Sequence, residues 1–388
     1  MRDTVALDTV SLDAVLLDIE RLVRCESPSD DLAAVARSAE VVAEIGTRLL
    51  GVAPETIVVE GCTHLRWRFG AVPRVLLLAH HDTVWPVGSL ETHPYEVRDG
   101  VMRGPGCFDM LTGLVMALHA VAALDDRDGI TLLVTGDEEL GSPTSRALIE
   151  EEARGCAGAL VLEASADGGA LKTERKGVSL YELVVEGRAA HAGLEPEKGV
   201  NAAVEVAHQV LAVAAMGDSA AGTTVTPTVV RAGTTTNTVA AGGSIAIDVR
   251  VRTVAEQDRV DRAVHALRPV LDGARMSVRG GPNRPPLEAT SSAALFARAS
   301  RIASGLGLAA PTSAAVGGAS DGNFTAGVGT PTLDGLGAVG GGAHADDEHV
   351  VVGQVADRTR LLAALVADLL KDGCEPATPA RLDEGVHA

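Results

Sequence analysis

The chain has 388 residues, of which 46% are hydrophobic and only 2% aromatic, and its formal net charge at pH 7 is −19. This length exceeds that of one ordinary domain, so we expect two domains, each with its own core. The negative charge argues against nucleic acids and anionic membranes as partners, because phosphate groups are bound by clustered Lys and Arg side chains.

The cysteines and the N-terminal segment indicate the compartment. The five cysteines are odd in number and lack paired spacing, which is typical of reduced thiols and not of a disulfide framework. The segment from Met1 to Thr4 has an early acid and no basic start before an apolar stretch, so no signal peptide is expected. Apolar stretches are also too short to span a bilayer. We therefore expect a cytoplasmic protein.

The first half of the chain alternates helical and strand patterns. Ser142 and Pro143 resemble an N-cap followed by a proline in the first helical turn. Strands separated by helices predict an α/β sheet with helices on both faces. In chain order, the expected elements are helices over 13–25 and 32–50, strands over 57–59, 65–69 and 75–78, a helix over 114–124, a strand over 130–135, a helix over 142–152 and a strand over 159–162.

The pattern changes after Gly177. Strands with alternating apolar and polar residues now flank two helices, in the order strand–helix–strand–strand–helix–strand, which predicts a small α+β domain of the ferredoxin-like type. We expect this domain to be inserted, with 178–290 as the insertion and 1–177 plus 291–388 as the main domain. Its expected elements are strands over 179–186, 223–231, 244–251 and 275–279 and helices over 200–216 and 255–271, and a final helix is expected over 355–370.

Polar side chains follow the apolar strands of the main domain. His80 and Asp82 end the strand that begins at Val75, and because strand side chains alternate between faces, both can point the same way. Asp82 could then orient the ring of His80 for a metal ion. A pair of surface histidines at a strand end is the alternative interpretation.

Carboxylates follow in the same manner. Asp109 lies in a Gly-Pro-Gly turn, Glu138 and Glu139 come directly after a buried strand, and Glu163 ends another. Adjacent acids at a strand end are costly unless cations neutralise them, although a solvated acidic loop is a common alternative. His344 follows three glycines in a loop that could cover a site. Two divalent cations that share a carboxylate need about this ligand set, which predicts a hydrolase.

Together these motifs resemble the M20 family of dinuclear zinc peptidases and aminoacylases, and the resemblance covers nearly the whole chain in order. It implies a zinc-peptidase-like main domain with an inserted lid domain. It also implies two zinc ions, or cobalt or manganese in their place, with Asp109 as the bridging ligand. By the same resemblance His80 and Glu163 would bind one ion, and Glu139 and His344 the other. Glu138 would act as general base and then as general acid, with Asp82 supporting His80.

The inserted domain carries further resemblances. His191 lies in a segment that resembles the lid motif, whose histidine helps stabilise the tetrahedral intermediate and comes from the partner subunit in dimeric members. Asn237 and Arg250 match residues that hold the free carboxylate of the substrate. Gly318 lies in a segment that resembles the glycine-rich substrate loop. A homodimer formed through the inserted domain is the implied assembly.

The expected activity is hydrolysis of an amide bond in a peptide or an N-acyl amino acid with a free carboxylate, as in a carboxypeptidase or aminoacylase. Two alternatives stay open. One is an amidase of specialised metabolism that removes an acyl or aminoacyl protecting group. The other is a non-catalytic binding relative that has kept the fold. The acyl group and the side-chain preference are not fixed by the residues.

Overall fold

A computed structural model of the chain describes residues 11–371 and divides into two compact units. The first unit runs to Leu171 and also includes Leu295–Thr312 and the chain from Val328. The second unit consists of Lys172–Ala294 and Ser313–Gly327. None of the described helices combines the length and apolar character that a membrane span requires. The N-terminal residues on which the signal-peptide prediction rests lie outside the described range.

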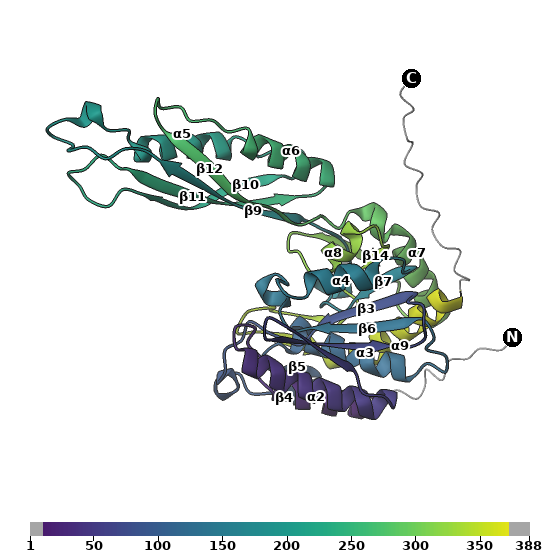
Figure 1. Ribbon diagram of the computed structural model, residues 1–388. Coiled ribbons are helices and arrows are strands. Elements are labelled where there is room, and N and C mark those ends of the chain that lie inside the picture. The colour runs from purple at the N-terminus through teal and green to yellow at the C-terminus, as the bar shows by residue number, and fades with distance from the viewer. Residues whose placement is uncertain (1–10, 372–388) are drawn as a thin grey trace, which may run out of the picture. The chain divides into compact units, whose positions relative to one another are not determined.

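The first unit is built on a six-stranded sheet of order β1-β2-β6-β3-β7-β14. Strands β6, β3, β7 and β14 are parallel neighbours, whereas β1 and β2 are antiparallel to the strands beside them. Helices lie on both sides of the central strands (Figure 1). The strands are β1 (Glu55–Val59), β2 (Cys62–Arg68), β3 (Val75–His80), β6 (Ile130–Thr135), β7 (Gly158–Val161) and β14 (Thr332–Leu333).

The core of this unit is formed by apolar strands that are covered by helices. Every residue of β3, β6 and β7 is buried, as expected for strands that are covered on both faces. Helix α2 begins after Asp31, whose carboxylate accepts from two backbone N–H groups, and ends at Gly51, which has a left-handed φ of 77°. The helices are α1 (Leu12–Val23), α2 (Leu32–Leu50), α3 (Thr112–Ala122), α4 (Arg146–Ala153) and α9 (Val352–Lys371); α7 (Ala289–Gly305) contains residues of both units.

A small antiparallel sheet of order β15-β16-β5-β4 supports two loops of the first unit. Strand β5 immediately precedes the loop that contains Asp109, and β15 and β16 flank the loop that contains His344. Because β16 pairs with β5, these two loops start from neighbouring strands. The strands are β4 (Glu96–Arg98), β5 (Val101–Arg103), β15 (Gly340–Gly341) and β16 (His349–Val351).

The second unit has a four-stranded antiparallel sheet of order β10-β11-β9-β12, with α5 and α6 packed against it (Figure 1). The chain order β9-α5-β10-β11-α6-β12 and this strand order are those of a ferredoxin-like domain. Together with the first unit, it confirms the predicted fold class. The elements are β9 (Gly177–Glu186), α5 (Ala202–Ala214), β10 (Thr224–Ala232), β11 (Gly242–Val251), α6 (Val254–His265) and β12 (Arg275–Arg284), besides β8 (Leu171–Arg175), β13 (Ser313–Val316) and α8 (Gly322–Gly327).

The expected element boundaries need two corrections, of which the first concerns the start of α4. Ser142 does not cap a helix, since its φ of 59° is left-handed and α4 begins only at Arg146. The carboxylate of Asp137 instead accepts from the backbone N–H groups of Thr144 at 2.7 Å and Ser145 at 3.2 Å.

The second correction concerns α6 and β12. Helix α6 ends at His265 instead of running to residue 271, because Pro269 disfavours helical backbone at the residue before it. Strand β12 continues to Arg284, five residues beyond the predicted end, by pairing with β9 past an irregularity after Pro282.

Candidate active site

The strand order brings three of the predicted ligands to one edge of the sheet of the first unit. His80 is the last residue of β3, Glu139 follows β6, and Glu163 follows β7. These three strands are parallel neighbours, so their carboxyl ends meet at the same edge. His80 Nε2 lies 3.6 Å from Glu163 Oε1. Glu138 joins them, with ligand atoms of His80, Glu138 and Glu163 all within 4.8 Å of one another.

The loops that carry Asp109 and His344 complete the cluster. Asp109 Oδ1 lies 3.7 Å from His80 Nε2, and Asp109 Oδ2 lies 3.4 Å from His344 Nε2. His344 Nε2 is also 3.2 Å from Glu139 Oε1. Different oxygens of Asp109 therefore face the two histidines, so that this carboxylate stands between them.

The spacing of these atoms suits a metal ion. Ligand atoms about 2.0–2.2 Å from a tetrahedral ion are separated from one another by roughly 3.3 Å, and the N–O separations above are close to that value. His80 Nδ1 lies 2.9 Å from the backbone oxygen of Asp82, which can only accept, so Nδ1 carries the proton in the neutral ring. The lone pair is then on Nε2, which is buried and has no hydrogen-bond partner in the described part of the chain. The residues present therefore fit a divalent cation.

The electrostatics of the cluster also favour a cation. Burial alone would lower the pKa of His80, but Asp109, Asp82 and Glu163 together raise this pKa well above its usual value. Hydrogen bonds with Asp109 and Glu139 raise the pKa of His344 to about 10. Burial raises the pKa of Glu139. A bound cation would stabilise the carboxylates that now interact with these imidazoles.

The carboxylate of Asp82 lies beside His80 and also holds the two neighbouring glutamates. Its carboxylate accepts from Ser29 Oγ at 2.6 Å and from the backbone N–H groups of Glu138 at 3.3 Å and Glu139 at 3.2 Å. Its Oδ1 is 3.4 Å from His80 Nδ1, farther than its own backbone oxygen. The side chain thus holds the backbone of the two glutamates and also faces His80, whose Nδ1 is nearer to the backbone oxygen of Asp82.

Glu348 is a residue that sequence reasoning missed. Its carboxylate is buried, with 3% exposure, and accepts from the backbone N–H groups of Gly106, Phe108 and Asp109. It follows two other acids, and nothing in the local pattern separates it from the exposed Asp346 beside it. The contact between the Glu348 carboxylate and the loop of Asp109 joins distant parts of the chain, so the residues around Glu348 do not indicate it.

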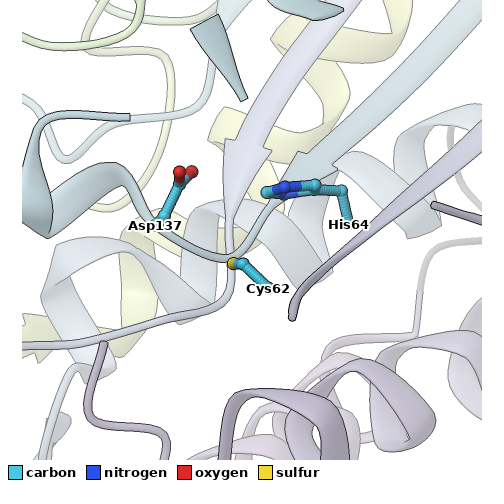
Figure 2. A group of neighbouring side chains, drawn as sticks. All are labelled: Cys62, His64 and Asp137. Atoms are coloured by element: carbon cyan, nitrogen blue, oxygen red, sulfur yellow. The ribbon is translucent and has the colours of Figure 1, made fainter. Parts of the chain in front are cut away.

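A second group of metal-capable side chains consists of Cys62, His64 and Asp137, the last of which directly precedes Glu138 (Figure 2). His64 Nδ1 accepts from the backbone N–H of Gly136 at 3.2 Å, and Nε2 lies 3.0 Å from Thr144 Oγ1. Both ring nitrogens are therefore in use. Burial lowers the pKa of His64, which agrees with a neutral ring.

The carboxylate and the thiol of this group are equally unsuited to a metal. Asp137 accepts from the hydroxyl groups of Thr144 at 2.7 Å and Ser145 at 2.5 Å, besides their backbone N–H groups. Burial raises the pKa of the Cys62 thiol to about 12, which disfavours the thiolate that binds metals. We interpret the group as a hydrogen-bond network that holds the backbone before Glu138.

The predicted lid residues lie in the second unit, and the structure separates them into two places. His191 and Asn237 are close, because Ala192 N–H donates to the backbone oxygen of Asn237 at 2.9 Å and His191 bridges to Thr238. His191 follows the end of β9 at Glu186, and Asn237 precedes the start of β11 at Gly242. Glu186 and Gly242 pair with each other.

Arg250 pairs instead with Val178 at the start of β9, eight residues from Glu186. At about 3.3 Å per residue, the two places are roughly 26 Å apart along the strand. Asp248 holds the Arg250 guanidinium through contacts of 2.9 Å with both carboxylate oxygens. The backbone oxygen of Gly318 accepts from Arg175 Nη1 at 3.1 Å.

Comparison with known proteins gives one consistent result. The model of peptidase family M20/M25/M40 matches residues 76–368. Carboxypeptidase G2 of Pseudomonas sp. is 31% identical over 308 residues, which cover 76% of this chain and 74% of that protein. Succinyl-diaminopimelate desuccinylase of Wolinella succinogenes is 26% identical over 310 residues, covering 76% and 84%. The aminopeptidase PepT structure from Bacillus cereus aligns with a TM-score of 0.72 at 21% identity, covering 93% and 99% of the two chains, and shares the fold.

Proposed function

We propose that this chain, which belongs to the metal-dependent hydrolases of peptidase family M20/M25/M40, cleaves an amide bond in a peptide or N-acyl amino acid that carries a free carboxylate. The observation that carries the proposal is the convergence of the predicted ligands around Glu138, from strands and loops far apart in the sequence. The two relatives support the substrate class, since one is named a carboxypeptidase and the other a desuccinylase of an amino acid.

The proposed centre holds two zinc ions, for which cobalt or manganese could substitute. His80 and Glu163 would ligate one ion, and Glu139 and His344 the other. Asp109 would ligate both, which the placement of its two oxygens toward the two histidines supports. Bound divalent cations supply Lewis acidity, which lowers the pKa of water and polarises the amide carbonyl.

Glu138 is the proposed general base and general acid. Its carboxylate would accept a proton from the attacking water and return that proton to the nitrogen of the leaving amine. Its backbone N–H is held by Asp82, and the preceding Asp137 is anchored by its hydrogen bonds to Thr144 and Ser145. These hydrogen bonds fix the backbone on both sides of Glu138. They thereby limit the movement of a side chain that must first take up a proton and then return it.

The lid residues are proposed to act on the substrate from two chains of a homodimer. Arg250, held by Asp248, would bind the substrate carboxylate, with Gly318 in the substrate loop. His191 would stabilise the oxyanion, and Gly193 N–H donates to its Nδ1 at 3.2 Å, so that Nε2 carries the proton. His191 and Asn237 lie roughly 26 Å along β9 from Arg250, which supports a partner subunit as the source of one set.

A panel of N-acyl amino acids and dipeptides tests the proposal. The zinc-loaded protein is incubated with each compound and products are measured by mass spectrometry, with matched compounds whose carboxylate is amidated. We expect cleavage of the carboxylate-bearing members and none by Glu138→Ala, which should still bind metal. Cleavage by Glu138→Ala would contradict the assignment of the base.

Two other results of the panel would redirect the proposal. Turnover confined to one unusual acyl group would indicate an amidase of specialised metabolism. A protein that cleaves no member of the panel and binds no zinc would be a binding relative, whereas zinc binding without cleavage would indicate a substrate outside the panel.

A further inference from the structure

We propose that Glu348 is a positioning residue that sets the spacing between Asp109 and His344 and thereby the affinity of the centre for metal. The inference rests on the proposed function in so far as it takes these two residues as ligands. It concerns a side chain outside the ligand set, whose carboxylate faces the protein backbone.

The hydrogen bonds of Glu348 divide evenly between its two oxygens. Oε1 accepts from the backbone N–H groups of Phe108 at 2.8 Å and Asp109 at 3.0 Å. Oε2 accepts from the backbone N–H of Gly106 at 3.0 Å and from Trp85 Nε1 at 2.6 Å. Both oxygens act only as acceptors toward N–H donors, as an ionised carboxylate does.

The loop before Asp109 depends on such an acceptor. Gly106 has a left-handed φ of 68°, and a Cβ atom at this position would lie 2.4 Å from Thr83 Cγ2. Phe108 is buried, and the backbone there is not part of any strand ladder. Buried N–H groups of irregular backbone must find an acceptor, and Glu348 supplies it for three positions of this loop.

Glu348 also belongs to the loop of the opposing ligand. It lies four residues after His344, and its own N–H donates to the backbone oxygen of Ala345 at 2.9 Å. The next residue, His349, pairs with Arg103, three residues before Gly106. The two loops are therefore joined at the strand pair and again at the carboxylate, close to where Asp109 Oδ2 and His344 Nε2 approach to 3.4 Å.

The bond to Trp85 adds a third ligand-bearing segment. Trp85 lies five residues after His80 and three after Asp82. One carboxylate thus contacts segments that carry His80, Asp109 and His344. Its loss should let these segments shift relative to one another, and ligands displaced by a fraction of an ångström bind metal less well. Removal of an outer hydrogen-bond partner typically costs about 10–100-fold in metal affinity or activity.

Glu205 offers a matched control. It is also a buried glutamate whose carboxylate accepts from backbone N–H groups, those of Val270 and Leu271, but it belongs to the second unit, which contains none of the proposed metal ligands. Glu348→Ala and Glu205→Ala should therefore both lower the Tm of the metal-free protein. Only Glu348→Ala should weaken metal binding.

The experiment measures zinc affinity by competition with a chromophoric chelator, zinc content by mass spectrometry, Tm of the metal-free protein, and kcat and KM. We expect Glu348→Ala to bind zinc about 10–100-fold more weakly. At saturating zinc, its kcat should fall by a larger factor than its KM changes. Wild-type zinc affinity and kcat in Glu348→Ala, with only the Tm lowered as in Glu205→Ala, would overturn the inference.

A second variant keeps the test decisive if Glu348→Ala does not fold. In Glu348→Gln, the amide oxygen can serve one pair of donors while the NH₂ group faces the other pair. In either orientation two N–H donors face the NH₂ group, so we expect Glu348→Gln to bind zinc more weakly than the wild type. Trp85→Phe removes one of the four donors and should also weaken zinc binding. Wild-type zinc affinity in both variants would contradict the positioning role.

The zinc measurements separate this inference from the proposed function. They do not depend on turnover, so they test Glu348 even if no amide on the panel is cleaved. Conversely, an active enzyme in which Glu348→Ala keeps wild-type zinc affinity and kcat would leave the proposed function intact and refute the positioning role.

Discussion

Replacing Asp82 by Ala should destabilise the first unit and weaken its metal site, by amounts that the hydrogen bonds suggest. The substitution leaves the backbone N–H groups of Glu138 and Glu139 without their acceptor, whereas the Ser29 hydroxyl can still donate to the backbone oxygen of Thr83 at 3.1 Å. A buried donor without an acceptor costs about 1–3 kcal/mol, so we expect a loss of roughly 2 kcal/mol in the free energy of unfolding, the lower end because water can enter the space. His80 keeps its bond to the backbone oxygen of residue 82. Zinc affinity should therefore fall only about tenfold, the low end for such partners.

Urea unfolding of the metal-free protein, followed by tryptophan fluorescence, measures the loss. Both tryptophans, Trp67 and Trp85, belong to the first unit, so their signal reports that unit even if the two units unfold separately. Ser29→Ala removes the hydroxyl donor itself and leaves no donor without an acceptor. It should therefore lower the free energy of unfolding by only about 1 kcal/mol. An Asp82→Ala variant within about 0.5 kcal/mol of the wild type would refute the view that this carboxylate holds the two glutamates.

The remaining predictions address the second side-chain group, pH and assembly. Cys62→Ala should bind as much zinc as the wild type, measured by mass spectrometry, because the group of Cys62, His64 and Asp137 is already satisfied by hydrogen bonds; loss of one ion would make it a metal site. The lowered pKa of His64 means that the unfolded chain takes up its proton more readily, so the stability it contributes is complete above about pH 6.5 and is lost as the pH falls below that value. His64→Gln should therefore flatten the decline of unfolding free energy on acidification, and an unchanged slope would contradict this. If His191 acts in the partner subunit, co-refolding equal amounts of His191→Ala and Glu138→Ala should restore about a quarter of wild-type activity from two inactive variants. About half of the two-fold dimers then contain one chain of each kind, and each of these dimers has one complete site. No recovery, with mixed dimers present by mass spectrometry, would place His191 in its own subunit's site.

Local patterns predicted much of the fold and several of the candidate residues that the structure brings together, for physical reasons. Strands β3 and β7 are apolar until the polar residues His80 and Glu163, so the position of these strands and the edge that carries the two residues could be predicted from the chain. The ferredoxin-like unit followed from alternating strands around two helices. The contact of Asp137 with the backbone just before α4 was missed because Ser142-Pro143 imitates an N-cap, and the acceptor lies several residues earlier in the chain.

Long-range carboxylate contacts could not be predicted in the same way. Glu348 accepts from N–H groups some 240 residues earlier in the chain, and its neighbours Asp346 and Asp347 have the same charge and the same local context. Asp82 was expected to support His80, and its carboxylate lies 3.4 Å from His80 Nδ1, but its contacts with residues 53, 56 and 57 positions away were not expected. Such partners are set by tertiary packing, which leaves no periodic signal in the sequence.

The central claim is that metal ions held by this cluster and the carboxylate of Glu138 together cleave an amide. The most direct test strips the protein with a chelator, restores zinc in steps, and follows both bound zinc, by native mass spectrometry, and the hydrolysis rate of a cleaved N-acyl amino acid. We predict no turnover without metal, full turnover at two ions per chain, and a Glu138→Ala variant that binds both ions but does not turn over. Turnover by the stripped protein, or by Glu138→Ala at the wild-type rate, would contradict the account.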